Sequence, residues 1–512
     1  MQGSRGHLLL LAAFVAAYAA CIAWYHAPYA GGSDSSGYIN SAQLILQGKV
    51  STPLRLPAGM PPDLARQEAF IPLGFRPDVT GREMVPTYPV GLPLHLAAIG
   101  WLTGLETASR IVAVATALAF MALLYFTGRE FGVRPVWSLG VAALGALSPL
   151  TLMYALQPMS DLLAAVWVLA TILWARLAAR HGAWACAAGF ALAIAVLVRP
   201  TNLLVAVPAL LAMPARPRVW LAFGLAGLPG ALFQAWYNHA LYGAYVTTGY
   251  GDVGMLFSWQ YIAPTLWHYL LWVPVVASPL VVAALALPWA KAPRHDKLVL
   301  GTWAGVLFAF YATYAFTNDT WWYLRFVLPA LPALGIAAAL VLQGAPLPAW
   351  FLASRLLPPA TPSDAVARGR VLRIPLAALA LVLAAGWQLR WSDRFHVTET
   401  ELDERGYPLA ARWVARSLPP DAVLLGQQVS GALLFYTSKP FLIQDWFNPE
   451  ECARLEAWLT QNHRSLYAAL YPHEEPLVWK IFPGNWVKVA KFRHATIYRR
   501  VDPLGAPPAS SP

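Results

Sequence analysis

An aspartate, Asp34, follows the first long apolar segment of the chain, within a polar sequence at residues 31–38. Residues 8–25 are long and apolar enough to cross a bilayer core of roughly 30 Å. A carboxylate at the boundary between water and lipid can deprotonate an acceptor while a lipid-anchored substrate stays in the bilayer. The alternative is a solvated loop acid or a helix cap. Asp34 is therefore a candidate general base.

A second acid, Asp161, follows Ser160 where one predicted apolar span ends and the next begins, on the same predicted side as Asp34. Ser160 and Asp161 also suit an N-cap and first helical turn, which is the structural alternative. If the two acids share a site, one would act as the base while the other orients the acceptor or holds a divalent metal. A divalent metal is thus a candidate cofactor, with its ligands left unassigned.

Two arginines on the same predicted side are candidates for binding a phosphate. Arg325 ends the aromatic sequence at residues 321–325, and its planar guanidinium suits a bidentate phosphate contact at the membrane edge. The alternative for Arg325 is an interfacial anchor beside a tryptophan and tyrosine belt. Arg199, at another outer turn, is a further candidate because outer cations run against the positive-inside bias. The arginines of the first outer loop are expected to be mostly solvated: Arg55, Arg66, Arg76 and Arg82.

Two other features border this set of residues. His95 lies in a short apolar segment, where a packing histidine with satisfied ring nitrogens is the alternative to a binding role. Residues 242–261 are rich in aromatic side chains, which suit either a sugar platform or a membrane-interface anchor. The sequence leaves both pairs of alternatives open.

Composition places the chain in a membrane. Of its 512 residues, 58% are hydrophobic and 12% charged, and the mean hydropathy is +0.50, whereas a soluble domain carries about 25% charged residues. The formal charge of +11 would fit nucleic acid, but the basic residues recur in short clusters between apolar segments, as in polytopic membrane proteins. Cys21, Cys186 and Cys452 form no pair that indicates a disulfide or metal site. Membrane lipids, and not nucleic acid, are the predicted surroundings.

The basic clusters alternate consistently if the N-terminus lies in the cytoplasm, which predicts a multi-pass protein of the cytoplasmic (inner) membrane with about eleven spans. Residues 88–103 contain three potential helix breakers and are predicted as a juxtamembrane or re-entrant helix of an outer loop at residues 26–107. The predicted spans are residues 8–25, 108–126, 136–155, 162–174, 183–198, 201–213, 219–236, 262–290, 298–316, 326–342 and 374–387.

The chain divides near residue 389 into a transmembrane module, residues 1–389, and a soluble extracytoplasmic α/β domain, residues 390–512. Apolar spacing in the second part predicts helices at 410–418, 429–436 and 449–462 and strands at 422–425, 440–444, 477–482 and 486–492. The tail from about residue 503 is rich in proline, alanine and serine and is predicted to be disordered.

Six short motifs, in this order along the chain, carry a family resemblance. They are SDSSGYI at 33–39 with QLILQG at 43–48, PTYPVGLPL at 86–94, GREFG at 128–132, SD at 160–161 and RFVLP at 325–329. Together they resemble the GT-C superfamily of integral-membrane glycosyltransferases. Within it they are similar to the protein O-mannosyltransferases and the aminoarabinose transferases, of the glycosyltransferase family 39 type. The resemblance runs from the N-terminus to about Trp387, and an outer α/β tail also suits the group.

The resemblance implies an inverting hexosyl- or pentosyltransferase that uses a polyprenyl-phosphate sugar donor. The acceptor would be a lipid, glycan or protein in the cell envelope, on the outer (periplasmic) side of the membrane. Asp34 would be the catalytic base with Asp161 beside it, and Arg325 the phosphate ligand, with Arg199, Tyr88 and His95 as further candidate donor contacts. The chain departs from the family in two places: Asp34 lacks an adjacent second acid, and Tyr88 stands where aminoarabinose transferases have a lysine.

Two other classes of function remain as alternatives. A transporter or flippase of lipid-linked sugars predicts ionisable residues near span centres and inverted repeats, and the sequence has neither. A non-catalytic envelope assembly protein predicts no special role for Asp34. A single substitution at Asp34 therefore separates the enzyme from the assembly protein.

Overall fold

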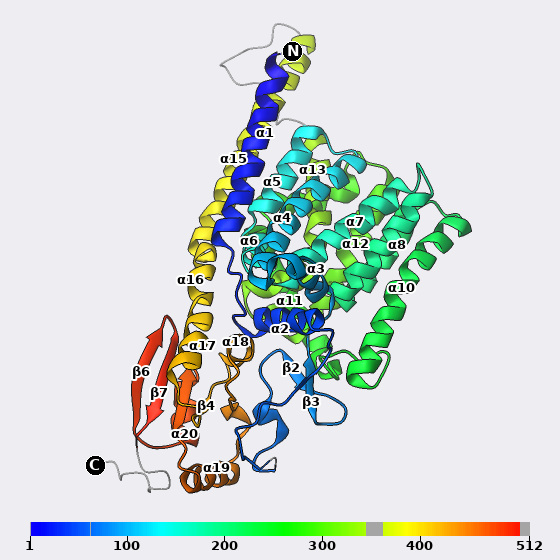
Figure 1. Cartoon of the computed structure of the whole chain (residues 1–512). Coiled ribbons are helices and arrows are strands. Elements are labelled where there is room, and N and C mark those ends of the chain that lie inside the picture. The colour runs from blue at the N-terminus through cyan, green and yellow to red at the C-terminus, as the bar shows by residue number, and fades with distance from the viewer. Residues whose placement is uncertain (1, 62, 345–361, 502–512) are drawn as a thin grey trace.

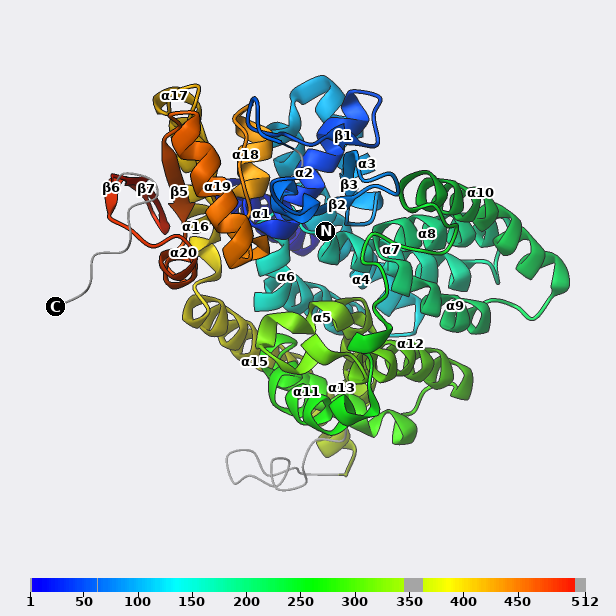
Figure 2. The ribbon, with the colours of Figure 1, turned by 90° about the horizontal axis from the view of Figure 1, so that it is seen from below.

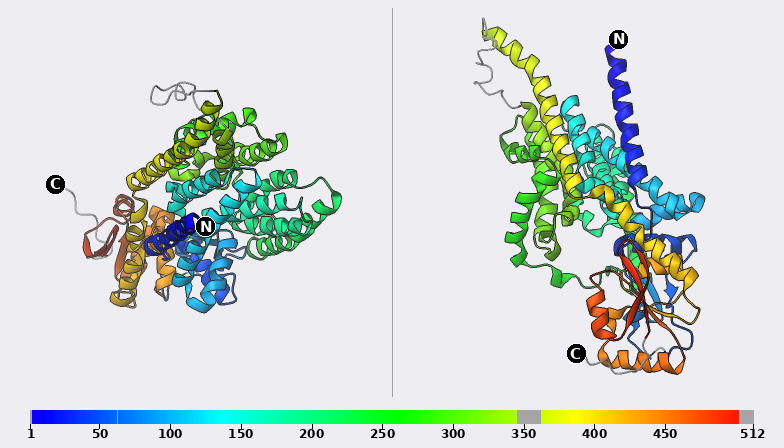
Figure 3. Two further views of the ribbon diagram at one scale, coloured as in Figure 1. Left: turned by 90° about the horizontal axis from the view of Figure 1, so that it is seen from above. Right: turned by 90° about the vertical axis from the view of Figure 1, so that its left-hand side faces the viewer.

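A bundle of helices carries a smaller sheet domain at one end (Figure 1). This computed structural model describes residues 2–61, 63–344 and 362–501. Helices α1 (Gln2–Tyr25) and α15 (Pro362–Arg394) both run toward the end that carries the sheet domain, and α2 (Ser33–Leu46) lies across that end (Figures 1 and 3). The predicted disordered tail from residue 503, and Arg355 of the predicted inner loop, lie outside the described residues.

The bundle is built from apolar helices joined by short turns, and several of the helices begin at a proline. Their bounds are α3 (Gly91–Thr103), α4 (Leu105–Glu130), α5 (Pro135–Leu147), α6 (Pro149–Ala155), α7 (Ser160–Leu177), α8 (Ala183–Val198), η2 (Pro200–Val205), α9 (Ala206–Ala212), α10 (Pro217–Tyr242), η3 (Gly254–Leu256), η4 (Trp259–Tyr261), α11 (Ile262–Val276), η5 (Pro279–Trp289), α12 (Arg294–Ala312), η6 (Ala315–Asn318), η7 (Trp321–Ala330) and α13 (Leu331–Gly344). Figure 2 shows these helices from the end that carries the sheet domain.

Several predicted spans are broken rather than continuous. Among the described residues, four helices are long and apolar enough to cross a membrane, or six if each of two bent pairs counts as one span. One predicted span, residues 136–155, bends by 57° between α5 and α6, and another, residues 262–290, bends by 114° between α11 and η5. Each break has a proline that starts the next helix, with Ser148 or Ser278 capping it. The chain is a multi-pass membrane protein, and the total of about eleven spans stays a prediction.

The basic clusters that were predicted to face inward gather at one end of the bundle. Arg176, in the last turn of α7, is 2.5 Å from Asp296 in the first turn of α12, and Arg180 is 2.8 Å from Glu130 at the end of α4. Asp161 is in the first turn of α7, so this candidate acid and the basic cluster lie at opposite ends of the same helix. Which end faces the cytoplasm stays a prediction from the positive-inside rule.

The C-terminal domain contains a four-stranded sheet in the order β4-β5-β7-β6. β4 (Val423–Leu425) pairs parallel with β5 (Leu466–Leu470), while β7 (Ala495–Arg500) pairs antiparallel with both β5 and β6 (Trp486–Phe492). The helical elements of this part are η8 (Val397–Glu399), α16 (Thr400–Glu404), α17 (Gly406–Ser417), α18 (Ser430–Tyr436), η9 (Gln444–Trp446), α19 (Pro449–Gln461) and α20 (Glu475–Ile481). A small sheet domain is therefore present, as the sequence predicted.

Two of the strands predicted in this domain are wrong, and two were missed. Residues 440–444 make only a single bridge, between Leu442 and Leu425, before a turn of 3₁₀ helix. Residues 477–482 fall mostly in α20, because a proline in the first turn of that element favours the start of a helix. Only Val478 of this helix is buried. The missed strands are β5, buried at every position, and β7. A fully buried strand lacks the alternation that marks a strand in sequence.

The first outer loop packs into the sheet domain. It forms its own antiparallel sheet in the order β1-β3-β2, from β1 (Thr52–Pro53), β2 (Phe75–Pro77) and β3 (Glu83–Pro86), and a 3₁₀ turn, η1 (Gln67–Phe70). Leu64 and Phe70 of the loop share an apolar core with the strand residues Val423 and Leu466. The outer loop, which the sequence places with the transmembrane module, thus contributes to the core of the C-terminal domain.

Candidate active site

Helix α2 places Asp34 in its first turn at the junction between the bundle and the sheet domain (Figure 1). The helix lies very close to the outer loop. A Cβ on Gly37 would meet the ring of Tyr88 at 2.4 Å, and one on Gly74, whose φ is +87°, would meet the Gly37 Cα at 2.7 Å. Glycine at both positions therefore allows the close approach that fixes α2 beside Tyr88.

Asp34 forms an ion pair with Arg325, which lies far away in sequence. The Nη1 of Arg325, in η7, donates to Oδ2 of Asp34 at 2.7 Å, and the two side chains keep 19% and 25% of their surface exposed. The guanidinium also lies over the rings of Tyr323 and Phe326, at 5.6 and 5.2 Å. In the part of the chain that the structure describes, the buried Nε of Arg325 has no hydrogen-bond partner. Arg325 thus keeps one buried N–H that no group in the described part of the chain engages.

Asp161 forms a second and more deeply buried ion pair, with Arg199. Nη2 of Arg199, at the C-cap of α8, donates to Oδ1 of Asp161 at 2.5 Å, and the Asp161 side chain has no exposed surface. Ser160 joins this pair to α2, because its hydroxyl accepts from Arg199 Nε at 3.4 Å and hydrogen-bonds the Tyr38 hydroxyl at 2.8 Å. Within the described residues, Oδ2 of Asp161 has no hydrogen-bond partner.

The structure brings both predicted acids and both predicted arginines into one electrostatic cluster. The charges of Arg199, Arg325 and Asp34 all act on the Asp161 carboxylate. The cluster contains two acids and two arginines, so it is neutral as a unit. Sequence order could not provide this pairing, since each arginine lies on a different element from its acid.

Three tyrosines surround Asp34. Tyr88 packs against Tyr38 with ring centroids 5.1 Å apart and meets Tyr250 edge-on at 6.1 Å. The Tyr88 hydroxyl hydrogen-bonds Ser33 Oγ at 2.8 Å, and burial together with the charge of Asp34 raises the pKa of Tyr88 well above its ordinary value. Tyr250 comes from the aromatic loop at residues 242–261, so this loop reaches the candidate site. The sequence analysis did not single out Tyr250 or Tyr38 as site residues.

His95 lies apart from this arrangement and is engaged on both sides of its ring. Its Nδ1 contacts the Gly91 carbonyl at 2.7 Å, and its Nε2 accepts from Trp167 Nε1 at 3.2 Å. Both ring nitrogens are therefore satisfied, which matches the packing role given as the alternative to donor binding.

The expectation that the first-loop arginines are mostly solvated is wrong for two of them. Arg55 donates to the Thr437 and Leu434 carbonyls and Arg76 to the Gly249 carbonyl. Arg66 is 3.5 Å from Glu451 but keeps 46% of its side-chain surface exposed, as expected. The partners of Arg55 and Arg76 are carbonyl groups of distant segments, and sequence gives no sign of where those segments meet the loop. These arginines tie the outer loop to the C-terminal domain and to the aromatic loop.

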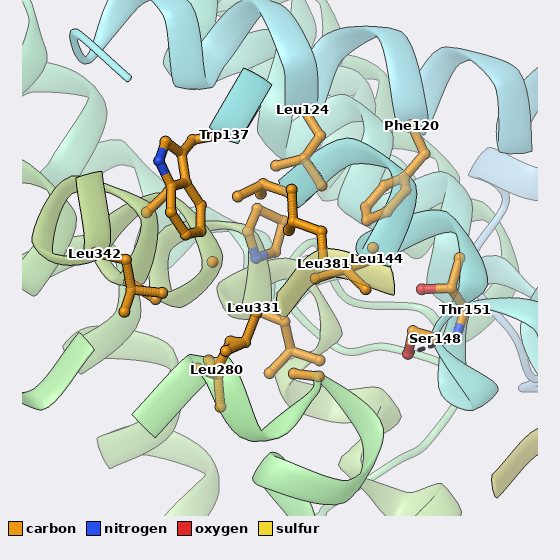
Figure 4. A pocket seen from close by; sticks show the side chains of 18 of the residues that line it. Phe120, Leu124, Trp137, Leu144, Ser148, Thr151, Leu280, Leu331, Leu342 and Leu381 are labelled. Atoms are coloured by element: carbon orange, nitrogen blue, oxygen red, sulfur yellow. Dashed lines mark hydrogen bonds between the residues drawn. The ribbon is translucent and has the colours of Figure 1, made fainter. Parts of the chain in front are cut away.

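An apolar cavity of about 60 Å³ opens within the helix bundle, lined by α4, α5, α6, η5, η7, α13 and α15 (Figure 4). Phe120, Trp137, Leu331 and Leu381 are among its walls. Leu328, another wall residue, follows Arg325 by about one helical turn in η7, so the cavity begins close to the Arg325 side of the cluster. Its lining suits a hydrocarbon chain.

The sequence left open a divalent metal held by the two acids, and the described side chains form no such metal site. Over residues 2–61, 63–344 and 362–501, no group of three or more histidine, cysteine, aspartate or glutamate side chains comes together as a metal site. Each acid of the cluster instead has an arginine as its cationic partner.

Comparison with known proteins places this architecture. No protein-family model and no curated protein sequence matches the chain. Among solved structures, the chain is similar to ArnT from Cupriavidus metallidurans bound to undecaprenyl phosphate, with a TM-score of 0.61 and 16% identity, over 97% of this chain and 99% of that one.

Two further structures share the architecture. The mycobacterial arabinofuranosyltransferase AftD matches with a TM-score of 0.52 and 15% identity, over 97% of this chain and 42% of that one. The oligosaccharyltransferase AglB from Archaeoglobus fulgidus, in complex with an inhibitory peptide and a dolichol-phosphate, matches with a TM-score of 0.50 and 11% identity, over 90% of this chain and 69% of that one. The chain therefore has the GT-C fold of membrane glycosyltransferases, as the motifs predicted.

Proposed function

We propose that this protein is a glycosyltransferase that moves a sugar from a polyprenyl-phosphate donor to an acceptor hydroxyl at the outer face of the cytoplasmic membrane. The observation that carries the proposal is the Asp34–Arg325 ion pair, at 2.7 Å, in the first turn of a helix at the boundary between bundle and sheet domain. A base and a phosphate-binding cation are the two groups that such a transfer requires.

In the proposed reaction, the acceptor oxygen attacks the anomeric carbon of the donor sugar from the face opposite the phosphate. The bond between the anomeric carbon and the phosphate oxygen breaks, and the polyprenyl phosphate leaves with the electron pair. Asp34 takes the acceptor proton as its oxygen becomes bonded to the sugar. This single displacement inverts the configuration at the sugar carbon.

Arg325 would link donor binding to the activation of Asp34. While Arg325 is paired with Asp34, the guanidinium occupies Oδ2 of that carboxylate. A donor phosphate offers the same guanidinium a second anion, which the partly exposed Arg325 side chain can contact. Donor arrival would therefore weaken the hold of Arg325 on Asp34 and free the carboxylate to act as a base.

The remaining parts of the donor have matching surroundings. The polyprenyl chain would extend from Arg325 into the apolar cavity that Leu328 helps to line. The walls of this cavity are mostly apolar, so burying a hydrocarbon chain there is favourable. The sugar would lie against Tyr88 and Tyr250, because an aromatic ring offers an apolar face to a sugar ring and a hydroxyl to its polar edge. Whether the sugar is a hexose or a pentose, and whether the acceptor is lipid, glycan or protein, is decided by the assay below.

The test compares the wild-type protein with Asp34→Asn in liposomes that contain a purified polyprenyl-phosphate sugar. Lipid-linked sugars and envelope glycans are first compared by mass spectrometry in cells with and without the protein, which identifies donor and acceptor. Asp34→Asn keeps the size of the side chain but removes the base, so turnover should fall by about 10²–10⁴. Asp319→Asn, an exposed acid six residues before Arg325, is the matched control and should retain activity.

Two results would contradict this account. Retained turnover in Asp34→Asn would reject Asp34 as the base and leave the transferase function standing. Movement of the intact lipid-linked sugar between leaflets, without transfer, would make the protein a flippase.

A further inference from the structure

The C-terminal domain contacts the short segment that leads from α1 into α2, just before Asp34. The Tyr29 hydroxyl donates to Glu401 Oε1 at 2.8 Å, the Ala30 amide to the Tyr436 hydroxyl at 3.3 Å, and the Gly32 amide to Glu404 Oε2 at 3.0 Å. These partners lie more than 370 residues away in sequence. The segment is therefore fixed by groups of another domain rather than by its own neighbours.

The contact between Glu404 and this segment is tight enough to require glycine. A Cβ on Gly31 would lie 1.6 Å from Glu404 Oε2. One turn further into α2, a Cβ on Gly431 of the C-terminal domain would lie 2.0 Å from Ser36 Oγ, and Asn40 Nδ2 donates to the Gly431 carbonyl at 2.8 Å. The first turns of α2 thus lie directly against the domain.

The Glu404 contact supplies a helix cap that α2 lacks in its own sequence. Gly32 is the N-cap residue of α2 and has no side chain to cap the helix. In a capping box, a glutamate at the third helical position accepts from the N-cap amide, but the third residue of α2 is Ser35. Glu404 accepts from that amide in its place.

We propose that Glu404 is a positioning residue for the candidate active site, which holds the first turn of α2 so that Asp34 stays aligned with Arg325. The effect on turnover rests on the proposed transferase function, whereas the effect on the α2 segment does not. A role of this kind gives the C-terminal domain a direct part in building the site, because Asp34 lies two residues after the amide that Glu404 accepts from.

The surroundings of Glu404 change the pKa of its carboxyl group. Burial raises the pKa of Glu404 to about 7, with the Gly32 amide opposing this shift and the charge of Asp403 adding to it. From α17 and the loop after β5, Tyr407, Tyr471 and Glu474 also face this region. The carboxyl group therefore changes charge near neutral pH, which gives the positioning role a pH-dependent readout.

The first experiment measures hydrogen exchange of the peptide that spans residues 27–40 in the full-length protein in detergent. Glu404→Ala removes the acceptor of the Gly32 amide, so exchange in this peptide should become about tenfold faster. Glu404→Gln keeps an acceptor oxygen and should exchange close to the wild-type rate. Asp403→Ala is the matched control, since Asp403 is the adjacent acid of α16 and pairs with Arg493 and His494 instead.

Turnover measurements on the same variants test the consequence for the site. Glu404→Ala should lower kcat by about tenfold or more at an unchanged donor KM, because a misplaced base slows the chemical step without weakening donor binding. Glu404→Gln should restore most of kcat and remove any inflection near pH 7 from its pH profile. Asp403→Ala should leave kcat unchanged.

A double-variant cycle separates positioning from general instability. Gly31→Ala places a methyl group where the Glu404 carboxylate lies, and should push that carboxylate off the Gly32 amide. Adding Gly31→Ala to Glu404→Ala should then have little further effect on exchange or kcat, because the contact is already lost. Fully additive effects would overturn the proposal.

The outcomes distinguish this inference from the proposed function. If the wild type transfers no sugar but the exchange pattern is found, the transferase function fails and the positioning of α2 stands. If transfer is found but Glu404→Ala exchanges and turns over like the wild type, the positioning role fails and the transferase function stands.

Discussion

The buried pair of Asp161 and Arg199 should stabilise the fold rather than take part in the chemistry. Asp161 was predicted as a second acid of the site, but its side chain has no exposed surface and that of Arg199 keeps 14%. We therefore expect Asp161→Asn to lower the free energy of unfolding by about 3–5 kcal/mol, as is usual when one partner of a buried pair is lost. Any fall in turnover of Asp161→Asn would follow from this loss of stability.

The structure indicates why an asparagine cannot compensate. Asparagine loses the negative charge opposite Arg199, and within the described residues the second carboxylate oxygen, Oδ2, is buried and has no hydrogen-bond partner. The Asp34–Arg325 pair differs, because both of its side chains are partly exposed, at 25% and 19%. Asp34→Asn should therefore cost less stability, toward the about 1 kcal/mol of exposed pairs.

Thermal unfolding in detergent checks this difference. Asp161→Asn should melt well below Asp34→Asn, and the double variant Asp161→Asn with Arg199→Gln should lose about 1–3 kcal/mol less than the sum of the single variants, because neither charge is left unpaired. A melting temperature of Asp161→Asn equal to that of the wild type would refute the reasoning. Strictly additive losses would show that the two side chains are not coupled.

Other predictions concern the donor, the sugar, pH and topology. Arg325→Lys should raise the donor KM more than it lowers protein level, because lysine loses the planar fork; equal KM values would make Arg325 an interfacial anchor. Tyr250→Ala should weaken sugar-donor binding while inhibition by free polyprenyl phosphate persists, and equal losses of both would argue against a sugar contact. The pKa of Glu404 is raised from 4.5 to about 7, so its protonated form favours the folded state and this stability is lost as pH rises through that range. Glu404→Gln should therefore have a higher melting temperature than the wild type at pH 8 and the same melting temperature at pH 4. A difference in melting temperature that does not change with pH would refute this. In a cysteine-free background, Glu450→Cys should label from outside and Arg180→Cys only from inside; the reverse would invert the topology.

The fold could be predicted from the sequence because the features that indicate it are local along the chain. Apolar length and alternating basic clusters indicate a polytopic bundle, since a helix in lipid must satisfy its own backbone and its flanking charges are read one loop at a time. The same locality explains the errors. Breaks at Pro149 and Pro279, and the buried strand β5, depend on what packs around those residues, which periodicity does not record.

The candidate site divides in the same way. The sequence by itself determined which residues were chemically suited: Asp34 and Asp161 as acids at the ends of apolar segments, and Arg199 and Arg325 as cations where cations are uncommon. Only the tertiary structure decided that Asp34 pairs with Arg325 and Asp161 with Arg199, that Tyr250 reaches the first of these pairs, and that Glu404 caps α2. Side-chain type is written at each position, whereas an ion pair or a cap between residues hundreds of positions apart is set by how the helices and the sheet domain pack.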